Sequence, residues 1–180
     1  MLARAFFDDP VSTWSCPPDG LRGPMLERFF FLRLQQVARK GEVWVAGEGR
    51  SAALWHGPEQ WRTTVKEDLE LATVQLHPRL VWRLPLVAWG LLGIERAHPH
   101  RPSHWYLSVL GTEPAEQGKG LGSAALRPVL ERCDRDGIGA YLESSKEANI
   151  PFYARQGFRV VDKLKLPWGP EVYPMWRDPR

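Results

Sequence analysis

Three glycines at alternate positions, 118, 120 and 122, favour tight turns that bring the backbone close to another group. Apolar residues then recur at helical spacing: Ala124, Ala125, Leu126, Val129 and Leu130. The pattern predicts a helix from about residue 120 to residue 136. The N–H groups of a first helical turn have no partner within the helix, and the helix dipole places positive charge there. The segment therefore predicts a phosphate-binding turn, to which Lys119 would add a positive charge.

Spacing excludes two common phosphate-binding motifs. The P-loop requires Gly-Lys followed by Ser or Thr, and here Lys119 is followed by Gly120. The dinucleotide fingerprint requires Gly-x-Gly-x-x-Gly directly after a strand. Here the glycines alternate, and a turn containing Pro114 separates them from the nearest expected strand. The segment fits neither a nucleotide kinase nor a dinucleotide-dependent dehydrogenase.

Hydrophobic periodicity and turn residues predict the remaining elements. In the first half we expect a helix over 3–9, a loop over 11–23, a helix over 24–40, a hairpin of strands 42–46 and 50–55, and two or three helices over 58–97, broken near Pro78 and Pro85. In the second half we expect a strand over 104–111, the helix described above, a strand over 140–144, a helix over 147–156, and strands over 158–166 and 171–177. This order predicts a mixed α/β sheet.

Size and composition suit one domain over residues 1–180, because 43% of the residues are hydrophobic and can form a core. The formal net charge is +3, and the basic residues are scattered, so nucleic acid is not expected as a partner. Cys16 and Cys133 form no Cys-x-x-Cys or Cys/His cluster, so neither a disulfide scaffold nor a metal site is expected. The His98-Pro-His100 sequence lacks the spacing of a helical ligand pair and is expected to be a loop.

The N-terminal residues lack the long apolar stretch of a signal peptide. The longest apolar stretch, residues 86–94, is interrupted by Gly90 and Gly93, and a membrane-spanning helix needs about 20 residues. We therefore expect a cytoplasmic protein with no membrane partner.

Two segments, in this order, carry a resemblance to a known family. The first is Gln-x-x-Gly-x-Gly at residues 117–122, with Pro114 three residues before it. The second is Asn-Ile-Pro-Phe-Tyr-Ala-Arg-Gln-Gly-Phe at residues 149–158. Together they resemble the GCN5-related N-acetyltransferase (GNAT) family. The resemblance implies an α/β GNAT fold, in which a mixed, mostly antiparallel, twisted sheet is flanked by helices, with no bound metal.

The resemblance also implies a site for coenzyme A. In the family, the glycine segment wraps the pyrophosphate, and the preceding strand carries a bulge and splays from its neighbour so that its backbone pairs with the pantetheine arm. Asn149 is expected near the pantetheine and the Tyr153 hydroxyl near the thioester sulfur. From the residues alone, Asn149 can equally be a helix cap before Pro151, and Tyr153 a packed aromatic. The implied cofactor-binding residues are Leu110, Gly111, Thr112, Gln117, Gly118, Lys119, Gly120, Leu121, Gly122, Ser123, Asn149 and Tyr153.

The activity implied is transfer of an acetyl group from acetyl-CoA to the amine of a small molecule, by direct attack in a ternary complex. Tyr153 would be the general acid and Glu143 the base, with Glu113 and His104 as weaker candidates for the base. Two alternatives stay open: acetylation of a protein or peptide, and a regulatory protein that binds acetyl-CoA without turnover.

Within the family, the sequence looks most like puromycin N-acetyltransferase and its relatives. Residues 58–97 are expected to form a helical insert on the substrate side, and residues 104–177 the cofactor-binding core. Acceptor contacts are expected from residues 11–35 and 58–102. Aromatic residues that could line an acceptor pocket are Trp14, Phe29, Phe30, Trp61, Trp82, Trp89 and Trp105. The chain opens within the family's first helix, so the usual first strand is expected to be absent or supplied by a partner, in a monomer or homodimer.

Overall fold

The central sheet is built on strands whose side chains alternate between two buried faces. All six residues of β2 (Ser51–His56) are buried. Ala53 and Trp55 belong to the core under helix α6 (Leu121–Asp136), whereas Ala52 and Leu54 belong to the core under α3 (Asp19–Lys40). Because successive residues of a strand point to opposite faces, one strand contributes to both cores.

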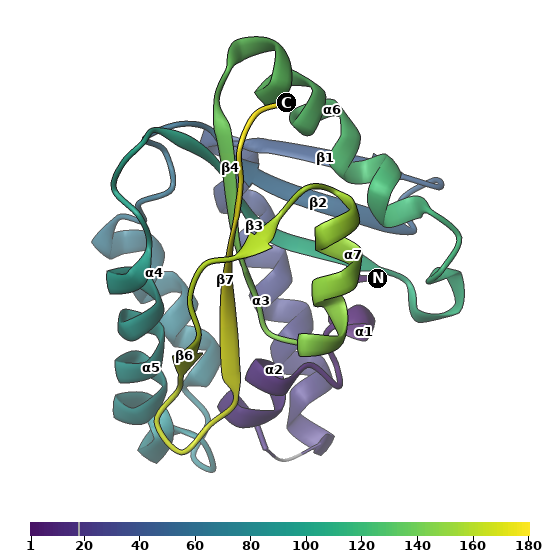
Figure 1. Cartoon of the computed structure of the whole chain (residues 1–180). Helices are drawn as coiled ribbons and strands as arrows, with labels where there is room; N and C mark the ends of the chain where they lie inside the picture. Colours follow the sequence, from purple (N-terminus) through teal and green to yellow (C-terminus); the bar gives the residue numbers. More distant parts are fainter. Residues whose placement is uncertain (18) are drawn as a thin grey trace.

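This arrangement comes from a computed structural model that describes residues 1–17 and 19–180 (Figure 1). Seven strands form the sheet in the order β1-β2-β3-β4-β7-β5, with β6 paired to β7 outside this path. All pairs are antiparallel except β3 with β4. The strands are β1 (Glu42–Ala46), β2, β3 (His104–Thr112), β4 (Gly139–Ser144), β5 (Arg159–Val160), β6 (Leu164–Lys165) and β7 (Glu171–Arg177). The sequence predicted this mixed, mostly antiparallel sheet, and the hairpin over residues 42–55 is confirmed.

Helices cover both faces of the sheet, and Figure 1 shows α3 behind it and α7 in front. The helices are α1 (Leu2–Ala5), α2 (Pro10–Ser15), α3, α4 (Val65–Ala72), α5 (Leu84–Ala97), α6 and α7 (Ile150–Arg155). Short 3₁₀ turns are η1 (Thr73–Gln75), η2 (Val81–Arg83), η3 (Pro114–Glu116) and η4 (Glu147–Asn149). Among the described residues, no helix combines the length and the apolar character needed to span a membrane.

The predicted loop over residues 11–23 is wrong, because helix α2 begins at Pro10 and α3 begins at Asp19. The Asp9 carboxylate caps α2 by accepting hydrogen bonds from the N–H groups of Val11 and Ser12. An Asp followed by Pro is therefore a helix start here, and the helix predicted over 3–9 is shorter than expected, since α1 ends at Ala5. Arg22, which is buried, donates to the carbonyls of Cys16 and Pro17 and so anchors the beginning of α3. The predicted start of this helix at Pro24 was five residues too late, and position 18 lies outside the described residues.

The predicted strand over 158–166 is also wrong in part. It consists of two short strands, β5 and β6, separated by residues 161–163. The Val161 N–H donates to the Pro174 carbonyl on β7, but Pro174 has no backbone N–H that could donate a hydrogen bond in return. The ladder therefore breaks at this position.

Helix α5, from the predicted helical insert, packs against the β6–β7 hairpin. Val87 of α5 meets Trp14, Leu166 and Val172 in one apolar cluster, which joins α2, α5 and the β6–β7 hairpin. Helices α4 and α5 are separated near Pro78, as predicted, whereas Pro85 lies in the first turn of α5 and not at a break. No strand precedes Glu42 in the described residues.

Strands β3 and β4 diverge, and this divergence places the site. Their parallel pairing runs from His104 opposite Gly139 to Leu107 opposite Leu142 and goes no further. On the other side of β3, the register with β2 skips one residue at Ser108, whose hydroxyl donates to the Leu54 carbonyl at 3.1 Å. The bulge that the resemblance implied therefore lies at Ser108, three residues before Gly111.

Candidate active site

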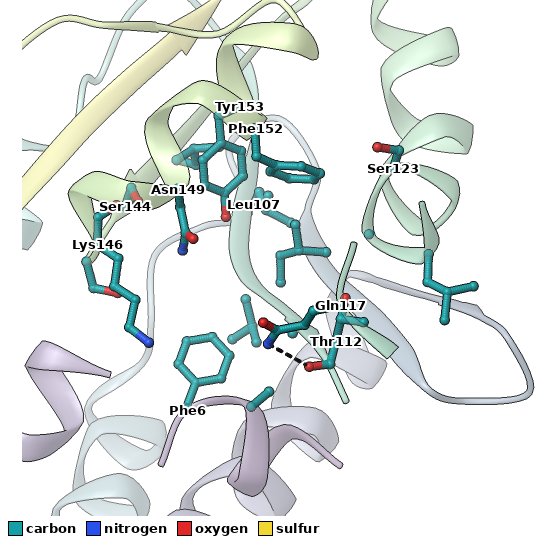
Figure 2. A pocket seen from close by; sticks show the side chains of 18 of the residues that line it. Phe6, Leu107, Thr112, Gln117, Ser123, Ser144, Lys146, Asn149, Phe152 and Tyr153 are labelled. Atoms are coloured by element: carbon teal, nitrogen blue, oxygen red, sulfur yellow. Dashed lines mark hydrogen bonds between the residues drawn. The ribbon is translucent and has the colours of Figure 1, made fainter. Parts of the chain in front are cut away.

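A cavity with a volume of about 550 Å³ opens where β3 and β4 part. Its walls come from the end of β3, the glycine turn, the end of β4 and the segment around α7 (Figure 2). Of the predicted site residues, it gathers Leu110, Gly111, Thr112, Gln117, Gly118, Gly120, Leu121, Gly122, Ser123, Glu143, Asn149 and Tyr153. We call this space the donor cavity.

The glycine turn presents its backbone to the donor cavity. Gly118 and Gly120 adopt φ angles of 80° and 81°, which side-chain-bearing residues rarely adopt. No side chain caps the N-terminus of α6, so N–H groups of its first turn remain available to an anion. Lys119 does not line the donor cavity: its side chain is 60% exposed and pairs with Glu116 at 3.1 Å. The cations in the wall are instead Lys146 and Arg155, which the sequence reading did not single out.

The residues before the turn are held by their neighbours. A Cβ on Gly111 would lie 2.6 Å from a Leu2 methyl group and 3.3 Å from Ala5, so close approach of α1 explains this glycine. The Thr112 hydroxyl hydrogen-bonds that of Ser51 at 2.9 Å, and its carbonyl accepts from the Gln117 amide at 3.4 Å. Position 111 is therefore a glycine because α1 packs against it, and the bulge lies instead at Ser108.

Tyr153 and Asn149 point into the donor cavity from one side (Figure 2). The Tyr153 ring is 8% exposed, and its burial raises the pKa of the phenol. The hydroxyl therefore stays protonated at neutral pH. Asn149 occupies the cap position of α7, but its side chain makes no capping hydrogen bond. Its amide is free to meet a ligand.

A second cavity of about 390 Å³ lies beyond the first, between the sheet and helices α3, α4 and α5. Its apolar lining residues are Phe6, Val11, Met25, Leu26, Phe29, Phe30, Trp61, Leu71, Val74, Val87, Leu91, Ile94, Val109 and Val172. The two cavities share Phe6, Asp9, Ser108, Val109, Glu143 and Ser145. We call this second space the acceptor cavity.

Only some of the predicted aromatics line the acceptor cavity. Phe29, Phe30 and Trp61 do so. Trp14 and Trp105 are buried in the cores, while Trp82 and Trp89 are 68% and 58% exposed.

Glu143 lies at the junction of the two cavities, and its surroundings were not predicted. Its side chain is 8% exposed, and its Oε1 is 3.4 Å from Nδ1 of His98, which is also buried. His98 belongs to the His-Pro-His segment, which is a loop as predicted, and it is the residue that directly follows α5 and caps its C-terminal end. The other two candidate bases do not line either cavity. Glu113 is bound by Arg4 at 2.7 Å and lines neither cavity, whereas His104 lies behind His98.

A covalent route through cysteine is not supported by the geometry. Cys133 is fully buried in the core and lines neither cavity, and its burial raises the pKa of the thiol to about 12. A thiol with such a pKa is not a thiolate at neutral pH. In the described part of the chain, no group of three or more His, Cys, Asp or Glu side chains is arranged to hold a metal ion.

Comparison with known proteins identifies relatives of the whole chain. Residues 50–158 match the model of the Acetyltransferase (GNAT) family. An uncharacterized N-acetyltransferase of Schizosaccharomyces pombe is 30% identical over 175 residues, which cover 92% of this chain and 70% of the relative. A mycothiol acetyltransferase of Brachybacterium faecium is 30% identical over 81% of this chain, which spans only 44% of that enzyme.

Among solved structures, a Corynebacterium glutamicum protein described as histone acetyltransferase HPA2 and related acetyltransferase superposes with a TM-score of 0.66. The superposition covers 99% of this chain and 87% of that chain, at 22% identity. This similarity concerns the fold.

Proposed function

The chain belongs to the acetyltransferase (GNAT) family, and from this premise we propose that it transfers an acetyl group from acetyl-CoA to the amine of an apolar small molecule. The donor cavity would hold coenzyme A, and the acceptor cavity the amine. In domain terms, residues 104–177 would form the cofactor-binding core and residues 58–97 the substrate-side insert. The observation that carries this proposal is that the two cavities meet at Glu143, which lines both.

On the donor side, the backbone would suit a diphosphate. The uncapped first turn of α6 offers N–H groups, and the open turn at Gly118 and Gly120 leaves space where side chains would stand. The pantetheine arm would lie along Leu110, Gly111 and Thr112, on the side of β3 where pairing with β4 has ended. Lys146 and Arg155 would supply the positive charge that we had expected of Lys119.

On the acceptor side, the walls suit a cationic amine with an apolar body. Helices α3, α4 and α5 supply most of the apolar surface, and the insert contributes residues from Trp61 to Glu95. The charged residues that line this cavity are Asp9, Arg33, Asp68, Glu95 and Glu143. With four carboxylates to one guanidinium, the cavity favours a positively charged ligand.

The reaction would proceed by direct attack in a ternary complex. Glu143 would accept a proton from the amine at the junction, and Tyr153 would protonate the departing thiolate. Holding the amine and the thioester in adjoining cavities would supply much of the rate enhancement.

The test is a screen for the release of CoA thiol from acetyl-CoA, in the presence of aminonucleosides, arylalkylamines, aminoglycosides, amino acids, polyamines and peptides. We expect turnover with amines that carry an apolar group, and the aminonucleosides test the resemblance to puromycin acetyltransferases. Turnover with peptides alone would show a protein acetyltransferase. Tight binding of acetyl-CoA without thiol release would show a regulatory protein and overturn the proposal.

A further inference from the structure

Behind Glu143, two buried histidines form a chain that ends at a backbone carbonyl. His98 Nε2 lies 3.0 Å from His104 Nε2, and His104 Nδ1 lies 2.8 Å from the Pro102 carbonyl oxygen. His98 and His104 are 3% and 2% exposed. These hydrogen-bonded histidines thus run from the junction of the two cavities into the interior of the protein.

The carbonyl at the end of the chain decides where the protons are. A carbonyl oxygen only accepts, so His104 must carry its proton on Nδ1. Burial lowers the pKa of His104, so this ring is neutral and its Nε2 is a bare acceptor. His98 must then donate from Nε2. In neutral His98, Nδ1 is therefore the unprotonated nitrogen, and it faces Glu143.

The contact between His98 and Glu143 has room for one more proton. Glu143 Oε1 is buried and has no hydrogen-bond partner among the described residues. A bare imidazole nitrogen and a carboxylate oxygen both offer lone pairs, so their 3.4 Å approach becomes favourable when a proton lies between them. His98 also ends helix α5, where the helix dipole favours positive charge.

Other titratable groups surround this pair, and the buried tyrosines and His56 among them do not take that proton. The groups are Arg33 on α3, His56 on β2, His104 and Tyr106 on β3, Tyr141 on β4, Glu95 in the wall of the acceptor cavity, and Glu59, which lines neither cavity. Burial raises the pKa of both tyrosines, so they keep their own protons. Burial lowers the pKa of His56 to about 3, so this ring stays neutral.

We propose that His98 is a proton-holding residue of the transfer reaction, which receives through Glu143 the proton that the acceptor loses before it attacks. The proposal rests on the function proposed above. Trp61 stacks on the His98 ring at 3.9 Å, and Tyr106 and Tyr141 meet it edge-on at 4.6 and 4.7 Å, so the ring is fixed in place.

The protons balance as follows. The ammonium form of the acceptor gives one proton to Glu143 and on to His98 Nδ1, which frees the nitrogen lone pair. The N–C bond then forms and the C–S bond breaks, while Tyr153 protonates the sulfur. A second proton leaves the new amide nitrogen and restores Tyr153. The products are the N-acetyl compound, the CoA thiol, and one proton that His98 holds until it is released to water.

The first test needs no acceptor. In protein labelled with ¹⁵N in histidine, we expect His104 as the neutral Nδ1–H tautomer and neutral His98 as the Nε2–H tautomer, with Nδ1 left unprotonated toward Glu143. A neutral His98 with its proton on Nδ1 would overturn the proposal whether or not any amine is acetylated.

The second test uses the best acceptor from the screen. His98→Gln should lower kcat/KM for the amine about 10- to 100-fold at pH 7, since general base catalysis contributes roughly 10²–10⁴-fold in full. The loss should shrink as pH rises, because the amine then arrives already neutral. His100→Gln is the matched control, two residues along, exposed, and in contact with Arg62 instead of Glu143. An equal loss at every pH, or the same loss in the control, would mean that His98 has only a structural role.

Discussion

The two cavities that meet at Glu143 are built in different ways. The donor cavity takes much of its wall from backbone: a glycine turn, the uncapped start of α6, and the end of a strand without a partner on one side. The acceptor cavity is lined by side chains from α3, α4 and α5, most of them apolar. A backbone site demands particular conformations, whereas a side-chain site demands only volume and polarity. We therefore expect mutations in the two cavities to change different constants.

The largest effect is expected at the proposed general acid in the donor cavity. Tyr153→Phe should lower turnover about 100-fold or more, because it removes the proton for the thiolate while it keeps the ring. The affinity for acetyl-CoA, measured by calorimetry, should be nearly unchanged. Tyr173→Phe is the control, since that hydroxyl donates to Glu171 and lines neither cavity. Undiminished turnover in Tyr153→Phe would remove this residue as the acid.

A backbone substitution sharpens the comparison on the donor side. Gly120→Val places a β-branched residue at a φ of 81°, which costs roughly 1–2 kcal/mol of stability. Its side chain would also stand in the open space of the turn where the diphosphate would lie, so the affinity for CoA should fall about 10-fold. Gly137, at the other end of α6, has a φ of 67° and equally open surroundings. Gly137→Val should therefore cost similar stability and leave CoA binding intact. If both variants bind CoA equally well, the phosphate-turn assignment is wrong.

A side-chain substitution tests the comparison of the two cavities on the acceptor side. Phe29→Ala removes an apolar wall of the acceptor cavity, and burying a phenylalanine is worth roughly 1.5–3 kcal/mol. Because the acceptor would contact only part of the Phe29 ring, KM for the acceptor should rise about 5- to 10-fold, while KM for acetyl-CoA stays the same. Phe31→Ala, two residues along and 61% exposed, should change neither constant. A rise in KM for acetyl-CoA would show that the two cavities are not independent.

The smallest effect is expected outside both cavities. Glu113→Gln should leave turnover within about twofold, a change as small as those expected for surface sites. The Arg4 guanidinium lowers the pKa of Glu113, so the ion pair stabilises the fold above the ordinary carboxyl pKa and ceases to do so as pH falls below it. Unfolding midpoints of the wild type and the variant should thus converge in acid. A large loss of turnover would reopen Glu113 as the base.

The donor side was largely predictable from the sequence. Gly118 and Gly120 have positive φ angles that few other residues adopt, so the requirement appears directly in the amino-acid types. The role of Lys119 was not predictable in this way, because a long side chain can turn to Glu116 as easily as to a ligand. Likewise, Gly111 is a glycine because of α1, and a bulge at Ser108 leaves no glycine to reveal it.

The acceptor side was predictable only as a region. Residues 58–102 do supply much of its wall, but nothing in their pattern separates Trp61, which lines it, from Trp89, which is exposed. His98 lies 45 positions before Glu143, and its importance depends on a long-range contact that no local pattern encodes. The one available signal was a histidine directly after an apolar helix, where a buried ring can cap its C-terminus.

The early end of the β3–β4 ladder has a consequence for folding as well as for chemistry. Beyond Leu107 and Leu142, one edge of each strand faces open space in the middle of the sheet. An extended ligand with amide groups of its own would act there as an additional strand and would make the sheet continuous. Amide hydrogens on both sides of the gap should then exchange with solvent more slowly, and the thermal midpoint should rise with ligand concentration. The bound substrate would be a structural member of the fold, inserted and withdrawn at each turnover.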